Sequence, residues 1–370
     1  MMNLMEKVNR AFSTDLDMSL IYFFGHNFDN HPTYYNCSTR TLDEWYALGQ
    51  PRPFLGAYFL ISGLILVAIY IPCIIVIARS DLMRSTCYKI MLWLSFLDLC
   101  CLSTNSISTG YLGLKGAVYC THPRFIFFMG ALGCGCWMGS CSTCILLAIN
   151  RCCDINDSLW IRKIFVGKRI YITLSVPFIY SIYSVFFCKP ILFNSNYMTW
   201  FFNPMTDTSS EFEYVSVAHT INNLVVSMCT TSLYTYLCIL LITKNRHVDS
   251  VNISRTQKQI FFQSILICSF NALAAYIYVY MQFFSSPNFL ILLGSLAWQC
   301  SHGSVGVVYI TMNKTVRRGV VKLLVPRFLR EKMRVGSFMT TTMRTNNPVS
   351  RFEQTSKQQA GTTGSSGAVF

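Results

Sequence analysis

The chain has 370 residues, of which 52% are hydrophobic and only 12% are charged. Soluble domains carry about 25% charged residues, so this composition excludes an ordinary soluble protein and indicates a membrane protein. The formal net charge of +14 is compatible with nucleic-acid binding, but Lys and Arg also accumulate on the cytoplasmic side of membrane proteins. We therefore expect the membrane as a partner and no nucleic acid.

Seven apolar runs follow a polar, mixed segment, residues 1–53, which we expect to be extracellular. Each run has the length of a helix that crosses the hydrocarbon core, which is about 30 Å thick. The runs cover residues 54–77, 88–110, 125–149, 170–187, 215–242, 260–284 and 289–312. The sequence therefore predicts an all-α membrane protein whose domain at 54–312 is a bundle of seven transmembrane helices.

The third run is the one around which we expect the other helices to pack. No charged residue lies between Arg124 and Arg151, and small residues fill the middle of the run. Gly135 and Gly139 have the GxxxG spacing that lets helices approach each other closely. So little side-chain bulk is typical of a helix that is surrounded by other helices rather than by lipid.

The chain after the seventh run divides into two predicted parts. Residues 313–325 have apolar side chains on one helical face and basic side chains elsewhere, which predicts a short amphipathic helix on the inner membrane surface. Residues 326–370 are expected to be a disordered cytoplasmic tail, because the chain from Gly336 onward is rich in Thr, Ser, Gly and Gln. The residues of the apolar face are Val316, Val320, Leu323 and Leu324.

The positions of Lys and Arg predict the orientation of the bundle. Most of the 30 basic residues lie in the segments after the first, third, fifth and seventh runs. Cytoplasmic segments are the ones enriched in basic residues, so we expect the N-terminus outside and the tail inside. Asn36 then lies in a glycosylation sequon on the outer side, whereas the matches at Asn156, Asn252 and Asn313 fall on the cytoplasmic side.

Asp98 is the one acidic residue, of 16 in the chain, that lies within an apolar run. A carboxylate inside a bilayer is costly and is by default a sign of a functional site. We interpret it as part of a functional site. The alternative is a protonated side chain that only forms a hydrogen bond with a neighbouring helix.

Polar residues in the fifth to seventh runs are candidates for a ligand cavity, and interhelical hydrogen bonds are the alternative role. Four cysteines of the third run share one apolar helix, so we expect them to pack and not to bind a metal. No catalytic set is present at a usable spacing, so we predict neither an enzyme nor a resident cofactor. The cavity candidates are His219, Asn222, Asn223, Asn271, Gln282, Gln299 and His302, and the cysteines are Cys134, Cys136, Cys141 and Cys144.

Several short strings stand in a fixed order between about Tyr34 and Gly319. They are Tyr35-Asn36-Cys37-Ser38, Asp43-Glu44-Trp45, Cys87-Tyr88-Lys89-Ile90-Met91, Gly116-Ala117-Val118-Tyr119-Cys120, Asn150-Arg151-Cys152, Asn222-Asn223, His302-Gly303, and Tyr309 with Asn313. Together they resemble the nematode serpentine receptors of class T, which are rhodopsin-like seven-helix chemoreceptors. The resemblance implies a G-protein-coupled chemosensory receptor for an unknown extracellular ligand. It also implies a multi-pass protein of the plasma membrane, in the ciliary membrane of sensory neurons, with a heterotrimeric G protein as partner.

The wider resemblance to rhodopsin-type receptors implies roles for single residues. Asp98 stands where these receptors bind a sodium ion or a polar network linked to activation, so the resemblance implies that Asp98 is part of an activation switch. Asn150 and Arg151 stand where they have Asp-Arg-Tyr, so the arginine is expected at the G-protein surface, but the acid that would pair with it is missing. Cys120 matches their outer disulfide cysteine. We favour Cys37 as its partner because both lie outside the apolar runs, with Cys188 as the alternative.

Two other functions are compatible with seven spans. A channel or transporter often has several charges or broken helices at the midplane, whereas this chain has a single acid there. A seven-helix membrane protein that no longer signals is the other alternative, because the activation motifs are altered.

Overall fold

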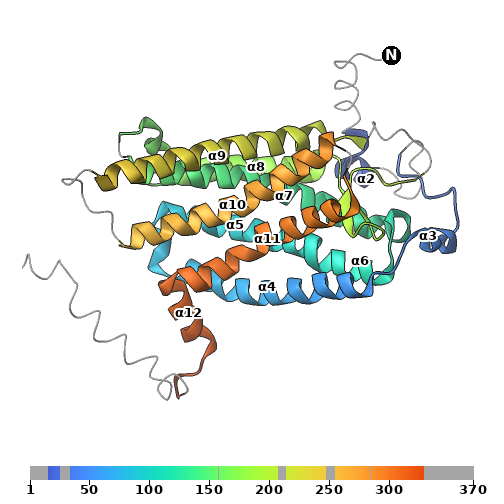
Figure 1. Ribbon diagram of the computed structural model, residues 1–370, viewed down its shortest axis with the longest axis horizontal. Helices are drawn as coiled ribbons and strands as arrows, with labels where there is room; N and C mark the ends of the chain where they lie inside the picture. Colours follow the sequence, from blue (N-terminus) through green and yellow to red (C-terminus); the bar gives the residue numbers. More distant parts are fainter. Residues whose placement is uncertain are drawn as a thin grey trace, which may run out of the picture. The chain divides into compact units, whose positions relative to one another are not determined.

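The computed structural model describes residues 16–25, 34–156, 158–206, 214–246, 255–284 and 286–328. Within these ranges, seven helical segments are long and apolar enough to cross a membrane (Figure 1). They are α4 (Pro53–Arg79), the continuous segment α5 (Thr86–Leu102), η2 (Ser103–Ser108) and α6 (Thr109–Lys115), α7 (Pro123–Ile155), α8 (Arg169–Phe187), α9 (Val217–Arg246), α10 (Arg255–Phe283) and α11 (Asn288–Met312). The predicted class, a seven-helix membrane protein, is confirmed.

The chain divides into two compact units, residues 1–317 and 318–370, and the seven-helix bundle lies in the first. Helix α12 (Lys314–Leu324) covers nearly the whole predicted amphipathic segment. It begins after Asn313, whose side-chain oxygen accepts hydrogen bonds from the backbone N–H groups of Thr315 and Val316 and so caps the helix. The prediction of a disordered tail concerns mainly residues 329–370, which lie outside the described residues.

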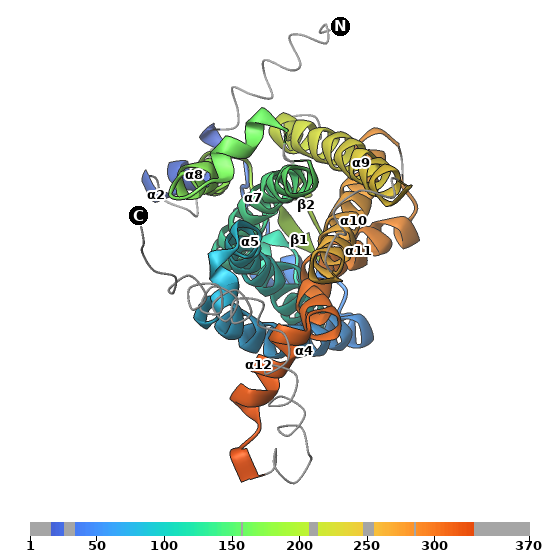
Figure 2. The same cartoon turned by 90° about the vertical axis from the view of Figure 1, so that its left-hand side faces the viewer.

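Helix α7 is the central helix of the bundle, as predicted (Figure 2). It contacts α5, α8, α9 and α10. Gly135 and Gly139 both face Ser181 of α8, and a Cβ atom at either glycine would lie within about 3 Å of that residue. The Ser181 hydroxyl donates a hydrogen bond to the carbonyl oxygen of Gly135 at 3.0 Å. The GxxxG spacing therefore serves the close approach of α7 and α8.

The second span contains a π-helical turn, η2, where the sequence predicts ordinary α-helix. Two of its polar side chains, Asn105 and Ser106, contact the seventh span. Asn105 donates to the carbonyl oxygen of Trp298 at 3.1 Å, and Gln299 donates to the hydroxyl of Ser106 at 3.0 Å. Such turns often occur at functional sites because they rotate the residues that follow.

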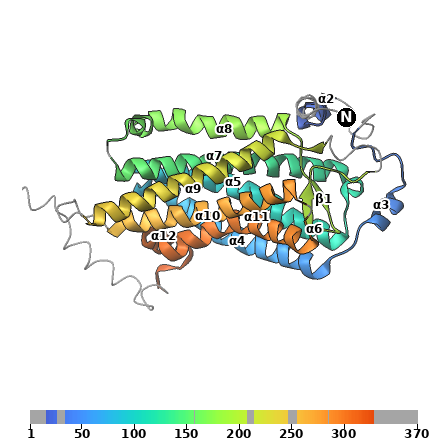
Figure 3. The same ribbon diagram turned by 45° about the horizontal axis from the view of Figure 1, so that its top comes forward.

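A short antiparallel hairpin, β1 (Leu192–Asn194) and β2 (Thr199–Phe201), was not predicted in a chain expected to be all-α. It contacts α6, α7 and α11 at the same end of the bundle as α3 (Leu42–Leu48) (Figure 3). Gly130 of α7 allows this contact, because a Cβ atom there would lie 1.6 Å from the carbonyl oxygen of Ile191. The hairpin therefore covers the end of the central helix.

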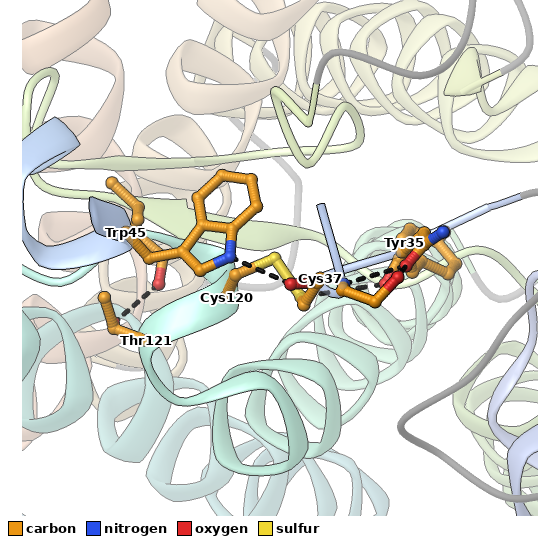
Figure 4. The surroundings of a disulfide bond; sticks show 8 residues. Tyr35, Cys37, Trp45, Cys120 and Thr121 are labelled. Carbon is orange, nitrogen blue, oxygen red and sulfur yellow. Dashed lines mark hydrogen bonds between the residues drawn. A yellow bond between two sulfur atoms is a disulfide. The ribbon is translucent and has the colours of Figure 1, made fainter. Parts of the chain in front are cut away.

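A disulfide joins Cys37, in the segment before α3, to Cys120, just before α7 (Figure 4). This is the pairing favoured above, and Cys188 takes no part in a disulfide. The indole N–H of Trp45 donates to the carbonyl oxygen of Cys37 at 3.0 Å. Helix α3 begins with a capping box, and hydrogen bonds from the backbone and side chain of Thr41 lower the pKa of the Glu44 carboxyl.

Candidate functional site

A cavity of about 220 Å³ lies between α7, α9, α10 and α11, on the side of the bundle that the hairpin covers. Aromatic side chains from five parts of the chain make up most of its lining. The cavity therefore exists only when the hairpin is folded against the helices. The aromatic lining includes Trp137, Trp200, Phe201, Phe202, Tyr278 and Trp298.

The polar lining of this cavity is sparse. Of the described side chains that line it, none is Asp, Glu, Lys or Arg. His219 lies between Phe202 and Tyr278, with ring centroids 5.1 Å and 6.3 Å away. Cavities of this kind, mostly apolar with a few convergent polar groups, are the usual form of a small-molecule site.

Of the predicted cavity residues, His219 lines this cavity, whereas Asn222, Asn223, Asn271, Gln299 and His302 do not. Asn223 lies behind its wall, where it accepts a hydrogen bond from the indole N–H of Trp137 at 2.9 Å. Asn222 donates to Asn223 at 3.2 Å, and Asn271 faces the Ser140 hydroxyl of α7 at 3.5 Å. The alternative role, interhelical hydrogen bonding, is therefore the one that the geometry gives these amides.

His302, another predicted cavity residue, instead lies in a buried polar core with Asp98. Its Nδ1 is 2.7 Å from Oδ1 of Asp98, and the hydroxyl of Tyr70 donates to Oδ2 of Asp98 at 2.6 Å. The side chains of Asp98 and His302 are 1% and 0% exposed, so the pair is shielded from solvent. The other ring nitrogen of His302, Nε2, is buried with no partner among the residues that the structure describes.

The surroundings of Asp98 do not fit a sodium ion in this arrangement. Both carboxylate oxygens already have partners, and an ion at Oδ1 would have to displace His302. Imidazole nitrogen is a poor ligand for a hard cation that prefers oxygen. Within the described ranges, no group of three or more His, Cys, Asp or Glu residues could hold a metal ion.

Trp137 belongs to both the cavity and the polar core. It lines the cavity, and its ring meets the ring of His302 edge to face, with centroids 5.7 Å apart and an interplanar angle of 81°. A ligand that moves Trp137 therefore acts directly on the partner of Asp98. The sequence held no local sign of this contact, because the two residues are on different helices.

Arg151 lies at the other end of α7, next to Asn150. The guanidinium is paired at 2.6 Å with Asp154, one turn further along the helix, and donates to the side-chain oxygen of Asn150. The expectation that Arg151 has no acid to pair with is thus wrong, because that expectation considered only the position directly before the arginine. Arg151 is 7% exposed, so a partner can reach it only after a rearrangement.

Comparisons with known proteins give the family. The profile of a family described as "Serpentine type 7TM GPCR chemoreceptor Srt" matches residues 18–333. Serpentine receptor class T-55 of Caenorhabditis elegans is 29% identical over 298 residues, which are 78% of this chain and 80% of that protein. A crystal structure of squid rhodopsin aligns with 80% of this chain and 91% of its own, with a TM-score of 0.49 and 12% identity.

Membership in a receptor family also implies a protein that is not an enzyme. The matched residues include all seven spans and the segment that carries the disulfide. The residues of the cavity and of the polar core therefore lie within the matched part of the chain. The chain belongs to the Srt family of serpentine seven-helix receptors, and it is a multi-pass membrane chemoreceptor of the G-protein-coupled type.

Proposed function

We propose that this receptor binds an extracellular ligand in the cavity beneath the hairpin and activates a heterotrimeric G protein at the opposite end of the bundle. The observation that carries the proposal is the double role of Trp137, which is shared by the cavity and the buried Asp98–His302 pair. Coupling between the cavity and the Asp98–His302 pair can travel through packed side chains, and Trp137 contacts both.

The orientation in this proposal has the hairpin end outside the cell. A disulfide ties the N-terminal segment to that end of α7, and disulfides persist in oxidising surroundings such as the cell exterior. Basic residues concentrate in the segments at the opposite ends of the helices, where the cytoplasm is expected. We propose the plasma membrane, and within it the ciliary membrane of sensory neurons, as the location of this protein.

The step on the cytoplasmic side is the release of Arg151. In the present arrangement Asn150 and Asp154 hold the guanidinium against its own helix. A released arginine offers donors in a fixed fork, which suits the carbonyl groups at the end of a partner helix. We therefore assign Arg151 to G-protein contact and Asn150 with Asp154 to its restraint.

The test is G-protein activation in cells, with a panel of small molecules and matched surface expression, for wild type, Arg151→Ala and Arg162→Ala. Arg162 lies in the following turn, η4 (Trp160–Phe165), and is the control for loss of positive charge in this region. We expect a ligand-dependent signal in wild type and Arg162→Ala, and its loss in Arg151→Ala. Equal signals in all three would remove the role of Arg151. Absence of any signal from folded surface protein would favour a non-signalling receptor, and ligand-gated ion flux would favour a channel.

A further inference from the structure

We infer that the cavity binds a small, uncharged ligand with an aromatic or otherwise apolar body and one hydrogen-bonding group. This inference rests on the proposed function only where it treats the bound molecule as the ligand that triggers signalling. Binding itself can be measured without any signal, so the two can fail separately.

The volume of the cavity limits the size of the ligand. It measures about 220 Å³, and an engineered protein cavity of about 150 Å³ is enough to hold benzene. The space therefore suits roughly one ring with a short substituent. A peptide does not fit into it without opening the bundle.

The lining argues against a charged ligand. A buried ion without a partner is strongly unfavourable, and no described side chain of the lining carries a permanent charge. Lys189 is close behind the wall, but it is fully buried, and its Nζ donates to the carbonyl oxygen of Val215 at 3.2 Å. Asp98 is separated from the cavity by Trp137 and His302.

The polar group of the ligand has one favoured position. The indole N–H groups of Trp137 and Trp200 already donate to Asn223 at 2.9 Å and to Thr109 at 2.8 Å. The indole nitrogen of Trp298 has no partner among the described residues, but it is buried and so does not reach the cavity surface. No hydrogen bond within the described part of the chain uses the hydroxyl of the neighbouring Tyr278, and His219 faces the same space. A hydroxyl or carbonyl group of the ligand is therefore expected at the His219–Tyr278 wall.

The aromatic body has a matching surface on the other walls. Three of the six tryptophans of the chain line the cavity: Trp137, Trp200 and Trp298. Aromatic rings in contact are stabilised by offset or edge-to-face geometry beyond the burial of area. The same three indoles make binding visible, because a nitroaromatic molecule in contact with an indole quenches its fluorescence.

The experiment uses the full chain in lipid nanodiscs and three probes: 4-nitrobenzyl alcohol, 4-nitrobenzoate and 4-nitrobenzylammonium. The probes share one ring and differ in the charge of one group. Trp160→Phe lowers the background, since Trp160 is 78% exposed and far from the lining set. We expect saturable quenching by the alcohol, with a dissociation constant at least about tenfold lower than for either ion.

Two histidine variants then test the position of the polar group. His219→Phe keeps a ring in the wall but removes the hydrogen bond, so alcohol binding should weaken about fivefold. His122→Phe is the matched control, because His122 lies before α7 and does not line the cavity. It should bind the alcohol as the parent does.

Three other outcomes count against the inference. Tighter binding of the ammonium or the carboxylate would mean that a charged partner reaches the cavity. Quenching that does not saturate with any probe would mean that the cavity does not take a ring of this size. Equal effects of both histidine changes would remove the His219–Tyr278 wall as the polar site. Selective binding of the alcohol in a receptor that never signals would leave the ligand class standing and contradict the proposed function.

Discussion

Trp137 is the residue whose side chain is needed both by the cavity and by the polar core. Trp137→Phe removes the hydrogen bond to Asn223 and most of the contact with His302 while leaving an aromatic ring. We expect an agonist, once found, to lose about tenfold in potency, equivalent to about 1.4 kcal/mol of coupling. Dose–response curves of G-protein activation would measure this.

The control is the same substitution at Trp93. That tryptophan stacks on Phe96 of its own helix, its indole nitrogen has no partner among the described residues, and it does not line the cavity. Trp93→Phe should leave potency unchanged. Similar losses in both variants would indicate a general effect of removing an indole rather than transmission through Trp137.

The Arg151–Asp154 pair predicts a restraint on basal activity. Asp154→Asn removes the charge that holds the guanidinium, and a partly buried pair of this kind contributes on the order of 1 kcal/mol. We expect agonist-free G-protein activation to rise about fivefold, because that energy no longer favours the inactive state. The control is Asp81→Asn, which breaks an i,i+3 pair with Arg84 whose side chains are 86% and 89% exposed. Equal basal activity in the two variants would contradict the restraint.

Asp98 gives a prediction about cations. Because His302 and Tyr70 already satisfy its carboxylate, replacing sodium by N-methylglucamine in the medium should leave the wild-type response unchanged. Asp98→Asn should reduce the maximal response several-fold, since the amide cannot accept both bonds. A sodium-dependent response in wild type that disappears in Asp98→Asn would instead restore a sodium site.

Polar contacts in the middle of the bundle show where reading a sequence reaches its limit. Asp98 could be singled out because a lone acid in an apolar run is conspicuous by itself. Its partner His302 is 204 residues away, and a pattern within one helix does not say which way a histidine of another helix points. The same limit applies to the asparagines of the fifth and sixth spans, because their sequence positions do not show that Asn223 bonds Trp137 and that Asn271 faces Ser140 rather than a cavity.

At the scale of elements, long apolar runs predicted the seven spans because each span must bury its backbone groups within its own helix. The hairpin escaped prediction because its strands are three residues long and are stabilised by packing on α7 rather than by a pattern of their own. Three cavity residues, Trp200, Phe201 and Phe202, are on or directly after β2. Much of the cavity lining was therefore missed because the hairpin that carries it was not predicted.

The packing of the hairpin against α7 can be tested directly at Gly130. In Gly130→Ala the new methyl group would occupy the position of the Ile191 carbonyl oxygen, 1.6 Å away, so β1 must move at a cost of about 1–3 kcal/mol. We expect weaker binding of 4-nitrobenzyl alcohol, measured by tryptophan quenching, with the helix content unchanged by circular dichroism. Gly294→Ala is no suitable control because it touches Met281 of the cavity lining. Ser175→Ala on α8 is suitable, since its hydroxyl bonds only within its own helix, and it should bind normally.

At the scale of the whole molecule, two sequons at opposite ends of α7 test the orientation. Asn36 is next to Cys37, which is bonded to Cys120 before α7, whereas Asn156 follows the last residue of that helix. The local geometry is nearly the same. Each asparagine oxygen accepts the backbone N–H and hydroxyl of the serine two residues on, at 2.9 and 2.7 Å for Ser38 and 3.2 and 2.6 Å for Ser158. Only the side of the membrane should then decide which asparagine is glycosylated.

We expect the receptor made in animal cells to carry a glycan at Asn36 and none at Asn156. Treatment with an N-glycosidase should increase its electrophoretic mobility, and Asn36→Gln should abolish that change while Asn156→Gln preserves it. The reverse result would place the hairpin, the cavity and the disulfide in the cytoplasm. It would therefore contradict the proposal that the ligand binds from outside the cell. Because every other step of the proposed mechanism depends on which end faces the outside, this inexpensive measurement should precede the search for a ligand.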